Sequence, residues 1–332
     1  MQTSSKFPVL LQGFFTQRLM NQRQASPHTI ASYRDTFRLL LRFAQARLLK
    51  PPSRIELADI DAPLVAAFLD DMEKDRRIAA RSRNLRLTAI RSFFRYAALE
   101  APDHSALIQR VLAIPSKRFT RSLITFLSTE EVEALLASPD QKNWIGRRDH
   151  VILLLMVQTG IRLSEMTTLQ RTNVILGSGA HIRVTGKGRK ERSIPLTKRT
   201  TAVLKAWIKE REIGTTGLLC PNARGGILSA DGMQYILNKH ITSARHQCPS
   251  LSNKHITIHS LRHTMAMELL LSGIEPVMIA LWLGHESVTT TQIYLHANLA
   301  LKESILAKTS MPDGKPGRYR PDDQLMEFLK NL

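Results

Sequence analysis

Cysteine is scarce in this chain: its 332 residues include two, Cys220 and Cys248, and these form no CxxC pair. We therefore predict no disulfide framework and a reducing compartment, the cytoplasm. A zinc site would have to combine both cysteines with His246 and His255, at spacings that match no standard zinc pattern. We predict no metal site from these residues.

Long apolar runs are missing as well. No segment reaches 18 uninterrupted apolar residues, and the start MQTSSKF is too polar for a secretory signal. We expect neither membrane insertion nor export. The composition, 43% hydrophobic and 23% charged, is that of an ordinary globular protein, and the length suggests about two domains.

Acidic residues are too few to balance the basic ones. The chain has 47 Lys plus Arg against 28 Asp plus Glu, a formal net charge of +19. Residues 1–127 have 21 Lys plus Arg against 10 Asp plus Glu. Ion pairs within the protein cannot neutralise this excess of positive charge. The partner predicted from this charge is a polyanion, most often nucleic acid, with an anionic membrane surface as the weaker alternative.

The first 110 residues have the pattern of a helical domain. Ser26 and Pro27 form a helix start, an N-cap followed by proline, ahead of apolar residues at helical spacing. Further helices fit residues 64–76 and 81–99, and the second of these has one apolar and one basic face. The predicted DNA contacts of this part are Arg81, Arg83, Arg86, Arg91, Lys117 and Arg118.

A linker is predicted over residues 111–127, where Pro115 interrupts the helical pattern, and Ser128 then caps the next helix. Beyond it the pattern is helical again, except near residues 181–196, where two β runs flank a Gly-Lys-Gly turn. The predicted fold is mainly α, with a small antiparallel sheet in the second domain. The predicted parts are a helical domain over 1–110, the linker over 111–127, a catalytic domain over 128–310 and a tail helix over 311–332.

Four short patterns of the second domain carry side chains suited to phosphate chemistry. TGIRLSE places Arg162 at a loop–helix junction, and HSLRH places His259 and Arg262 on one helix face. LGHES sets His285 beside a glycine turn. The hairpin tip TGKGRK presents Lys187 between two glycines, where a backbone can approach nucleic acid closely.

Each pattern alone has a common structural explanation, an ion pair, a core histidine or a solvated turn. A fifth stretch, TTTQIYLH, adds Tyr294, and a buried tyrosine usually only fills space. In this chain order, however, the patterns resemble the tyrosine recombinase family of site-specific integrases, whose signature is R, K, H-x-x-R, H or W, then Y. The signature positions are filled by Arg162, Lys187, His259, Arg262, His285 and Tyr294.

The resemblance extends over nearly the whole chain. SPHTIASYRDTFR and SRNLRLTAIRSFFRY look like parts of the family's N-terminal core-DNA-binding (SAM-like) domain. It implies an enzyme that cuts and rejoins duplex DNA through a 3′-phosphotyrosyl intermediate and a Holliday junction. It also implies a bacterial, nucleoid-associated protein that works as a tetramer on DNA. The chain looks Xer-like or transposon-encoded, and more loosely like the mobile-element integrases encoded as three adjacent recombinases, which makes related recombinases candidate partners.

The chemistry of these side chains supports the same roles. Arg162 and Arg262 are suited to clamp the growing negative charge of a phosphodiester under attack. Tyr294 is a competent nucleophile if a nearby group accepts its proton, and His259 is the candidate acceptor. His285 would donate a hydrogen bond to the phosphate.

The remaining roles concern the leaving group and the support of the site. Lys187 would protonate the leaving 5′ oxygen, and Glu165 would orient a member of the site. Arg189 and Lys190, on the same hairpin tip, are further predicted DNA contacts. No metal or other cofactor is implied.

Three other functions are alternatives for this sequence. A type IB topoisomerase resembles the same catalytic arrangement but relaxes supercoils as a monomer. A metal-dependent DDE transposase would need three carboxylates, and nothing in that chemistry explains the order of the signature residues. A repressor without enzymatic activity explains the charge but leaves Tyr294 and HSLRH unexplained. Covalent protein–DNA adducts formed without metal would support only the recombinase and the topoisomerase.

Overall fold

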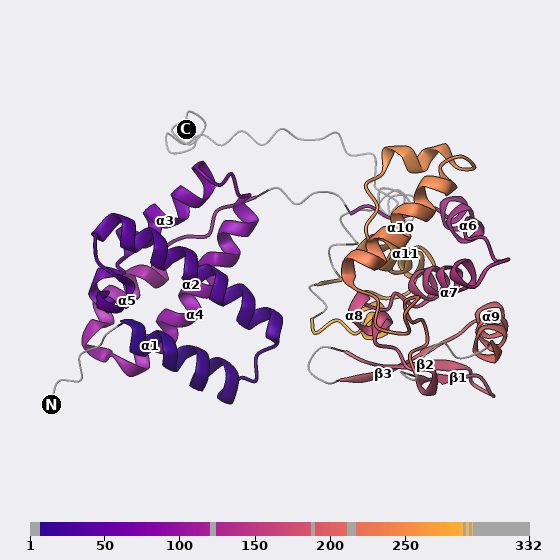
Figure 1. The fold of residues 1–332 in the computed structure, drawn as a ribbon, viewed down its shortest axis with the longest axis horizontal. Coiled ribbons are helices and arrows are strands. Elements are labelled where there is room, and N and C mark those ends of the chain that lie inside the picture. The colour runs from indigo at the N-terminus through magenta and orange to yellow at the C-terminus, as the bar shows by residue number, and fades with distance from the viewer. Residues whose placement is uncertain are drawn as a thin grey trace, which may run out of the picture. The chain divides into compact units, whose positions relative to one another are not determined.

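The computed structural model describes residues 7–119, 124–186, 190–210, 217–287, 290–291 and 294. The chain divides into two compact units, Met1–Arg121 and Ser122–Leu332 (Figure 1). Both are mainly helical, and the second contains an antiparallel sheet, which confirms the predicted fold class. The boundaries at residues 110 and 128 stay predictions. Lys187, Arg189 and the predicted tail helix lie outside the described residues.

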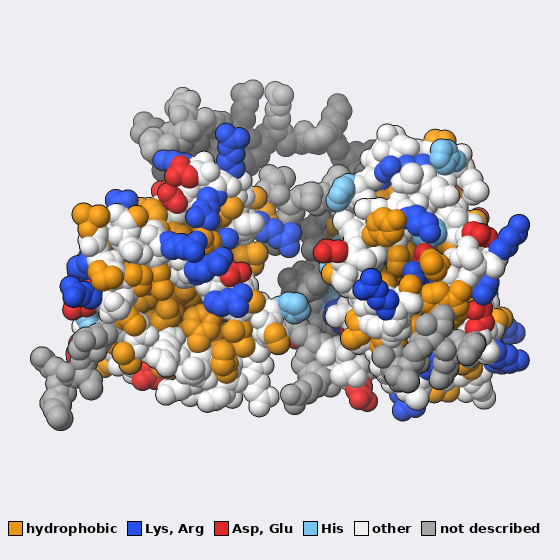
Figure 2. All heavy atoms as spheres, in the orientation of Figure 1, with side chains coloured by type: hydrophobic (Ala, Val, Ile, Leu, Met, Phe, Trp, Pro, Cys, Tyr) orange, Lys and Arg blue, Asp and Glu red, His pale blue; other side chains and the backbone are white. Residues whose placement is uncertain are grey.

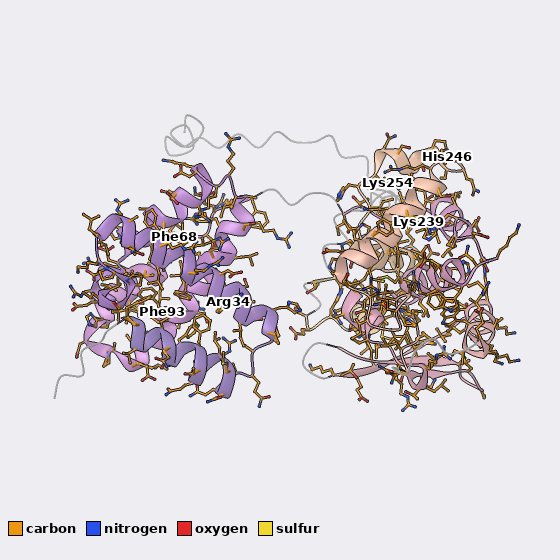
Figure 3. The ribbon with its side chains drawn as sticks, viewed as in Figure 1. Arg34, Phe68, Phe93, Lys239, His246 and Lys254 are labelled. Atoms are coloured by element: carbon orange, nitrogen blue, oxygen red, sulfur yellow. The ribbon has the colours of Figure 1, made fainter. Side chains whose placement is uncertain are left out.

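The first unit is built from helices that enclose an aromatic core. Helix α2 begins as predicted, because the Ser26 hydroxyl accepts the Thr29 N–H at 3.3 Å and Pro27 follows at the first helical position. Phe68 and Phe93 are buried, whereas Arg34 on α2 is exposed (Figure 3). The elements are α1 (Phe7–Gly13), a π-helix (Phe14–Gln22), α2 (Pro27–Leu48), α3 (Ala62–Lys74), α4 (Ala80–Glu100) and α5 (Ser105–Ala113), with 3-10 turns at Pro52–Arg54, Leu57–Asp59 and Pro102–His104.

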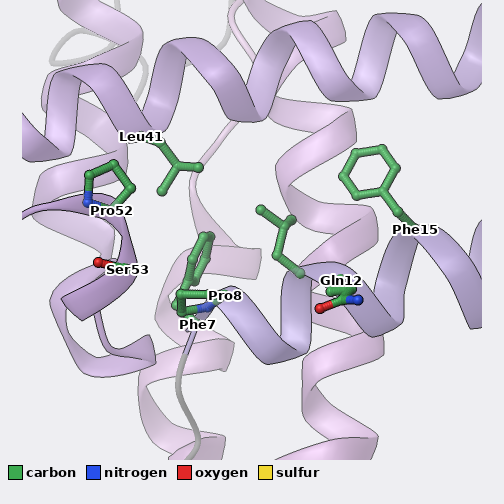
Figure 4. A pocket seen from close by; sticks show the side chains of 8 residues that line it. Phe7, Pro8, Gln12, Phe15, Leu41, Pro52 and Ser53 are labelled. Carbon is green, nitrogen blue, oxygen red and sulfur yellow. The ribbon is translucent and has the colours of Figure 1, made fainter.

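A pocket of about 350 Å³ opens between α1, the π-helix, α2 and the turn at Pro52–Arg54 (Figure 4). Its wall is largely apolar and includes no titratable side chain. This pocket therefore offers no acid, base or charged group for phosphate chemistry. The lining residues are Phe7, Pro8, Leu11, Gln12, Phe15, Leu41, Pro52 and Ser53.

The second unit surrounds helix α7, most of which is buried. Helices α6, α9 and α11 pack against α7. The sheet has the order β1-β2-β3, and Ile182 of β2 pairs with Ile194 of β3 so that both side chains enter the core. The elements are α6 (Thr129–Ala137), α7 (Trp144–Thr159), α8 (Leu163–Thr167), β1 (Val174–Ile175), β2 (His181–Thr185), β3 (Glu191–Pro195), α9 (Lys198–Lys209), α10 (Ala230–Ala244), α11 (Ile258–Leu271) and α12 (Pro276–Leu283), with 3-10 turns at Arg171–Asn173 and Pro249–Asn253.

Two polar groups fix the helices of this unit. Ser128 caps α6 as predicted, and Glu131 of the same capping box accepts a hydrogen bond from Lys254 at 2.6 Å (Figure 3). Inside the core, the Asp149 carboxylate of α7 accepts a hydrogen bond from the neighbouring Arg148 at 2.7 Å and hydrogen-bonds His240 of α10 at 3.0 Å.

No helix in the described part of the chain is long and apolar enough to cross a bilayer.

Candidate phosphate-binding and nucleophile site

The site begins where helix α7 ends. Gly160 ends α7 in the left-handed conformation, with φ of 61°, which favours glycine. A side chain here would also collide with Leu283, because a Cβ built on Gly160 lies 2.5 Å from its Cδ2. The chain then turns, and Arg162 becomes the N-cap of α8. This is the loop–helix junction that the sequence predicted.

Glu165 lies at the centre of a charged cluster with two arginines. It accepts hydrogen bonds from the backbone N–H of Arg162 at 2.9 Å and from its Nη1 at 2.8 Å. It also accepts from both terminal nitrogens of Arg192, at 2.9 and 2.8 Å. Burial by itself would raise the pKa of this carboxyl, but the hydrogen bonds and charges of Arg192 and Arg162 lower it to about 2. Glu165 is therefore ionised at neutral pH and holds two guanidinium groups together.

Arg262 of α11 reaches the same place from another direction. Its terminal nitrogens donate to the carbonyl oxygens of Gly160 and Leu283, both at 2.6 Å. Burial, and then the charges of Arg162 and Arg192, lower its pKa to about 10, so it stays protonated at neutral pH. Three arginines beside one carboxylate leave a surplus of positive charge, which suits an oxyanion ligand.

The turn after α12 packs directly on this cluster. Arg162 donates to the carbonyl of Gly284, and Nε of Arg192 donates to the carbonyl of Trp282 at 3.2 Å. Gly284 has φ of 67°, and a Cβ at this position would lie 3.0 Å from Nη1 of Arg192. The glycine thus lets the backbone that leads to His285 lie against the arginines.

The β2–β3 hairpin approaches the cluster through Gly186. A Cβ built on Gly186 would lie 3.1 Å from Oε1 of Glu165 and 3.4 Å from Nη1 of Arg162. The Gly186 N–H donates to the carbonyl of Lys190 at 2.8 Å and so closes the base of the tip. Lys187, the predicted proton donor, directly follows Gly186 in the sequence and lies outside the described residues.

Two of the predicted histidines belong to this electropositive region. Partial loss of hydration, and then the charges of Arg262 and Arg162, lower the pKa of His259, whose ring is exposed. His285 is half-buried, and its Nδ1 lies 2.8 Å from the Thr291 hydroxyl. Burial, and then the arginine charges, lower the pKa of His285 to about 4. The His285 ring is therefore neutral at pH 7.

Tyr294 is buried, with 2% of its surface exposed, among apolar side chains of α11 and α12. Its hydroxyl oxygen lies 3.0 Å from Nδ1 of His263, and the two rings meet edge to face with centroids 5.6 Å apart. Burial raises the pKa of the Tyr294 hydroxyl, and the charge of Arg262 opposes this rise. The structure thus brings Tyr294 to the site, with a histidine other than the predicted His259 as its hydrogen-bond partner.

Three residues of the site were absent from the sequence-based prediction: Arg192, His263 and Thr291. His263 lies within HSLRH and Thr291 within TTTQIYLH, but these patterns assign no role to either residue. For Arg192, the pattern of residues 181–196 predicts only a position in a strand. A signal existed in each case, because each lies within a few residues of a predicted site residue. The hydrogen bonds of Arg192 to Glu165 and of His263 to Tyr294, however, join segments that are distant in the sequence.

The predicted DNA contacts fall into two groups. The first is accessible to solvent, and the second, the engaged group, makes hydrogen bonds or ion pairs within the protein. Arg81, Arg118 and Lys190 are exposed, and Arg86 is half-buried, with burial and the charge of Arg76 lowering its pKa. On the visible face of the first unit, Lys and Arg side chains gather with few acidic ones among them (Figure 2). These exposed side chains are available to a polyanion.

The engaged group holds residues 114–117 against α4. Arg83, which is 4% exposed, donates to the carbonyl of Pro115 at 3.4 Å, and Arg91 donates to the carbonyl of Ile114. Lys117 pairs with Glu73. These three side chains use hydrogen-bonding capacity within the protein, and DNA contact by them stays a prediction.

In the described ranges, no group of three or more His, Cys, Asp or Glu side chains is placed so that it could hold a metal ion.

Comparisons with known proteins agree over both units. Residues 125–300 match the phage integrase family, and residues 13–101 match the phage integrase N-terminal SAM-like domain. The Sinorhizobium fredii protein y4rC, whose name describes an integrase/recombinase, is 64% identical over 97% of each chain. Tyrosine recombinase XerC of Pelobacter propionicus is 32% identical over 86% of this chain and 90% of its own.

Solved structures share the fold. The XerH site-specific recombinase bound to difH substrate, a pre-cleavage complex, is 25% identical, with a TM-score of 0.64 over 86% of this chain and 81% of that chain. The Tn1549 transposon integrase in complex with transposon right end DNA is 14% identical, with a TM-score of 0.68 over 91% of this chain and 99% of that chain. The family matches and the identities to named relatives show that this chain belongs to the phage integrase family and is a tyrosine recombinase, an enzyme of site-specific DNA recombination.

Proposed function

We propose that this recombinase cuts duplex DNA with the hydroxyl of Tyr294 and forms a 3′-phosphotyrosyl ester. The proposal rests on one observation. Four side chains from separate segments lie together in a region with a surplus of positive charge: Arg162, Arg262, His285 and Tyr294. The ester keeps the energy of the broken bond, so that rejoining needs neither ATP nor a divalent ion. The XerH relative, described as bound to its DNA substrate before cleavage, supports DNA as the substrate.

Arg162 and Arg262 are proposed to bind the scissile phosphate. Each already uses part of its guanidinium on protein carbonyls, which fixes its orientation before DNA arrives. Fixed donors cost no reorganisation when charge grows on the nonbridging oxygens, and this is why they stabilise a transition state better than mobile ones. His285, hydrogen-bonded to Thr291, is proposed to add a further hydrogen bond to the phosphate.

Lys187 is proposed to protonate the leaving 5′ oxygen. Support comes from Gly186, the residue before Lys187 in the sequence, whose backbone packs against Glu165 and Arg162. A lysine beside several arginines has a lower pKa than one in water, and so releases its proton more readily.

We further propose that four copies act together on two DNA sites and that the tail of one copy docks on a neighbour. A protein surface suited to this lies at the end of α11 and along α12, where large apolar side chains are exposed. These side chains are Leu271, Ile274, Val277, Met278 and Leu281. In the tail sequence, Leu325, Phe328, Leu329 and Leu332 have the spacing of one apolar helix face.

The test is covalent trapping on DNA in the presence of a chelator. The substrate is a nicked duplex carrying the site recovered by sequencing the genomic fragments that the full chain retains. Wild type is expected to accumulate a protein–DNA adduct, because the short strand released at the nick cannot rejoin. Tyr294→Phe is expected to form none while it retains the DNA.

The matched control is Tyr235→Phe, because Tyr235 is 70% exposed on α10 and lies outside the proposed site. This variant should form adducts at the wild-type rate. Adducts formed by Tyr294→Phe at that rate would remove Tyr294 from the mechanism.

A further inference from the structure

The hydroxyl of Tyr294 has a specific partner in the structure. Nδ1 of His263 lies 3.0 Å from the hydroxyl oxygen, and the edge-to-face contact of the two rings sets their relative orientation. His263 directly follows Arg262 on α11, so one helix turn carries both a phosphate-binding guanidinium and the ring that touches the nucleophile. A single rigid element thus fixes both groups.

The other histidines of the site are engaged differently. Nδ1 of His285 is hydrogen-bonded to Thr291, and the exposed ring of His259 lies under the influence of Arg262 and Arg162. Within the described residues, the ring hydrogen-bonded to the Tyr294 hydroxyl is that of His263.

The charge states of the two groups allow the Tyr294 hydroxyl to donate this hydrogen bond. Burial, and then His259 and Arg262, lower the pKa of His263 to about 4, so its ring is neutral at pH 7. Burial raises the pKa of Tyr294, so its hydroxyl keeps its proton. With His263 in its Nε2–H tautomer, the one that proton transfer from Tyr294 requires, the Tyr294 O–H donates to the lone pair of Nδ1.

We propose that His263 is a catalytic residue that accepts the proton of Tyr294 during attack on the phosphate. The inference rests on the proposed function of Tyr294. In the step, the bond between the tyrosine oxygen and phosphorus forms and the bond between phosphorus and the 5′ oxygen breaks. The tyrosine proton moves to Nδ1 of His263, and Lys187 supplies a proton to the 5′ oxygen. Rejoining reverses each transfer.

DNA binding itself would make His263 a better base. The charge of Arg262 is one cause of the low pKa of His263, and a bound phosphate offsets that charge. A bound scissile phosphate therefore raises the pKa of His263, against burial and His259, which continue to lower it. A resting enzyme would then keep its nucleophile protonated and inert, whereas the DNA complex would activate it.

The test uses His263→Asn in the full chain. Asparagine can still accept a hydrogen bond from Tyr294 but cannot take its proton at neutral pH. Cleavage in a single turnover, on saturating nicked duplex, should fall by about 10² to 10⁴-fold, with DNA affinity unchanged. The matched control, His255→Asn, changes an exposed histidine ahead of α11 and should cleave normally. A His263→Asn enzyme that cleaves at the wild-type rate would overturn the proposal.

Two further measurements separate this role from others. A duplex with sulfur in place of the bridging 5′ oxygen has a leaving group that needs no proton. On it, Lys187→Ala should recover its rate and His263→Asn should not; recovery by both would assign His263 to the leaving group instead.

Imidazole added to His263→Ala should restore cleavage, with a pH profile that follows the pKa of imidazole. A failure to restore cleavage in folded protein would count against proton transfer.

The two proposals, for Tyr294 and for His263, fail in distinguishable ways. If Tyr294→Phe still forms adducts, the proposed function is wrong. If Tyr294 is the nucleophile and His263→Asn cleaves normally, only the role of His263 is wrong.

Discussion

Replacing Glu165 by glutamine would test the charge balance at the centre of the site. The side chain of Glu165 is 3% exposed and accepts hydrogen bonds from two guanidinium groups. Glutamine keeps the shape of the side chain but removes its charge. Arg162 and Arg192 would then lie beside each other, and beside Arg262, without the carboxylate that pairs them.

The pKa of Glu165 gives the size of the effect. Its ordinary value is 4.5 and its value in the folded protein is about 2. A lowered carboxyl pKa stabilises the folded state above the ordinary pKa, and this contribution is lost as the pH falls through the folded value. The ionised carboxyl therefore contributes about 3 kcal/mol at pH 7 and about 1 kcal/mol at pH 3, and almost nothing near pH 1.

Tryptophan fluorescence during urea unfolding would measure this difference in the full chain. The tryptophans, Trp144, Trp207 and Trp282, all belong to the Ser122–Leu332 unit, so the signal follows the unit that contains the site. Glu165→Gln should lower the free energy of unfolding by about 3 kcal/mol at pH 7, and the gap from wild type should narrow toward pH 3.

The matched control is Glu210→Gln, because Glu210 pairs with Arg147 at 2.7 Å in a more exposed place, and such pairs contribute at most about 1 kcal/mol. A loss below about 1 kcal/mol in Glu165→Gln, or a loss that does not change with pH, would refute the reasoning.

Three further changes test the supports of the site and the assembly. Arg192→Lys keeps the charge but loses the two-pronged contact with Glu165, so cleavage on saturating DNA should fall at least tenfold with little change in affinity; equal losses in both would show a docking role. Thr291→Val removes the hydrogen bond to His285 and should slow cleavage about tenfold, whereas Thr291→Ser should not, and equal rates in both variants would contradict this role. Deleting residues 312–332 should leave binding to one half-site nearly intact and abolish cooperative binding to paired half-sites in gel-shift titrations, and unchanged cooperativity would place the tail on its own domain.

Much of the fold was predictable because its signals are local. The caps at Ser26 and Ser128 satisfy the first N–H groups of their helices through neighbouring residues, so the helix starts can be read from a few letters. Strand β1, with two residues, is too short for an alternating pattern and exists through its pairing with β2. Helix α9 was not predicted, because its buried apolar side chains, Leu204 and Trp207, form a thin stripe among polar and basic residues.

The site was only partly predictable for a similar reason. Arg162, Arg262 and His285 belong to short motifs, whereas Arg192 acts through a carboxylate 27 positions earlier. His263 meets a tyrosine 31 positions later. Among the basic residues of the first unit, composition predicted the excess of charge, but it could not separate exposed side chains from Arg83 and Arg91, which hold the segment after α5.

Peptide mapping of the trapped adduct would locate the covalent bond between Tyr294 and DNA. Trypsin cuts after Lys and Arg, so it would release residues 263–302, in which Tyr294 is the one tyrosine. After nuclease digestion of the DNA, we expect the mass of a residual nucleotide on this peptide. Attachment to a peptide containing Tyr33, Tyr96, Tyr235 or Tyr319 would contradict it.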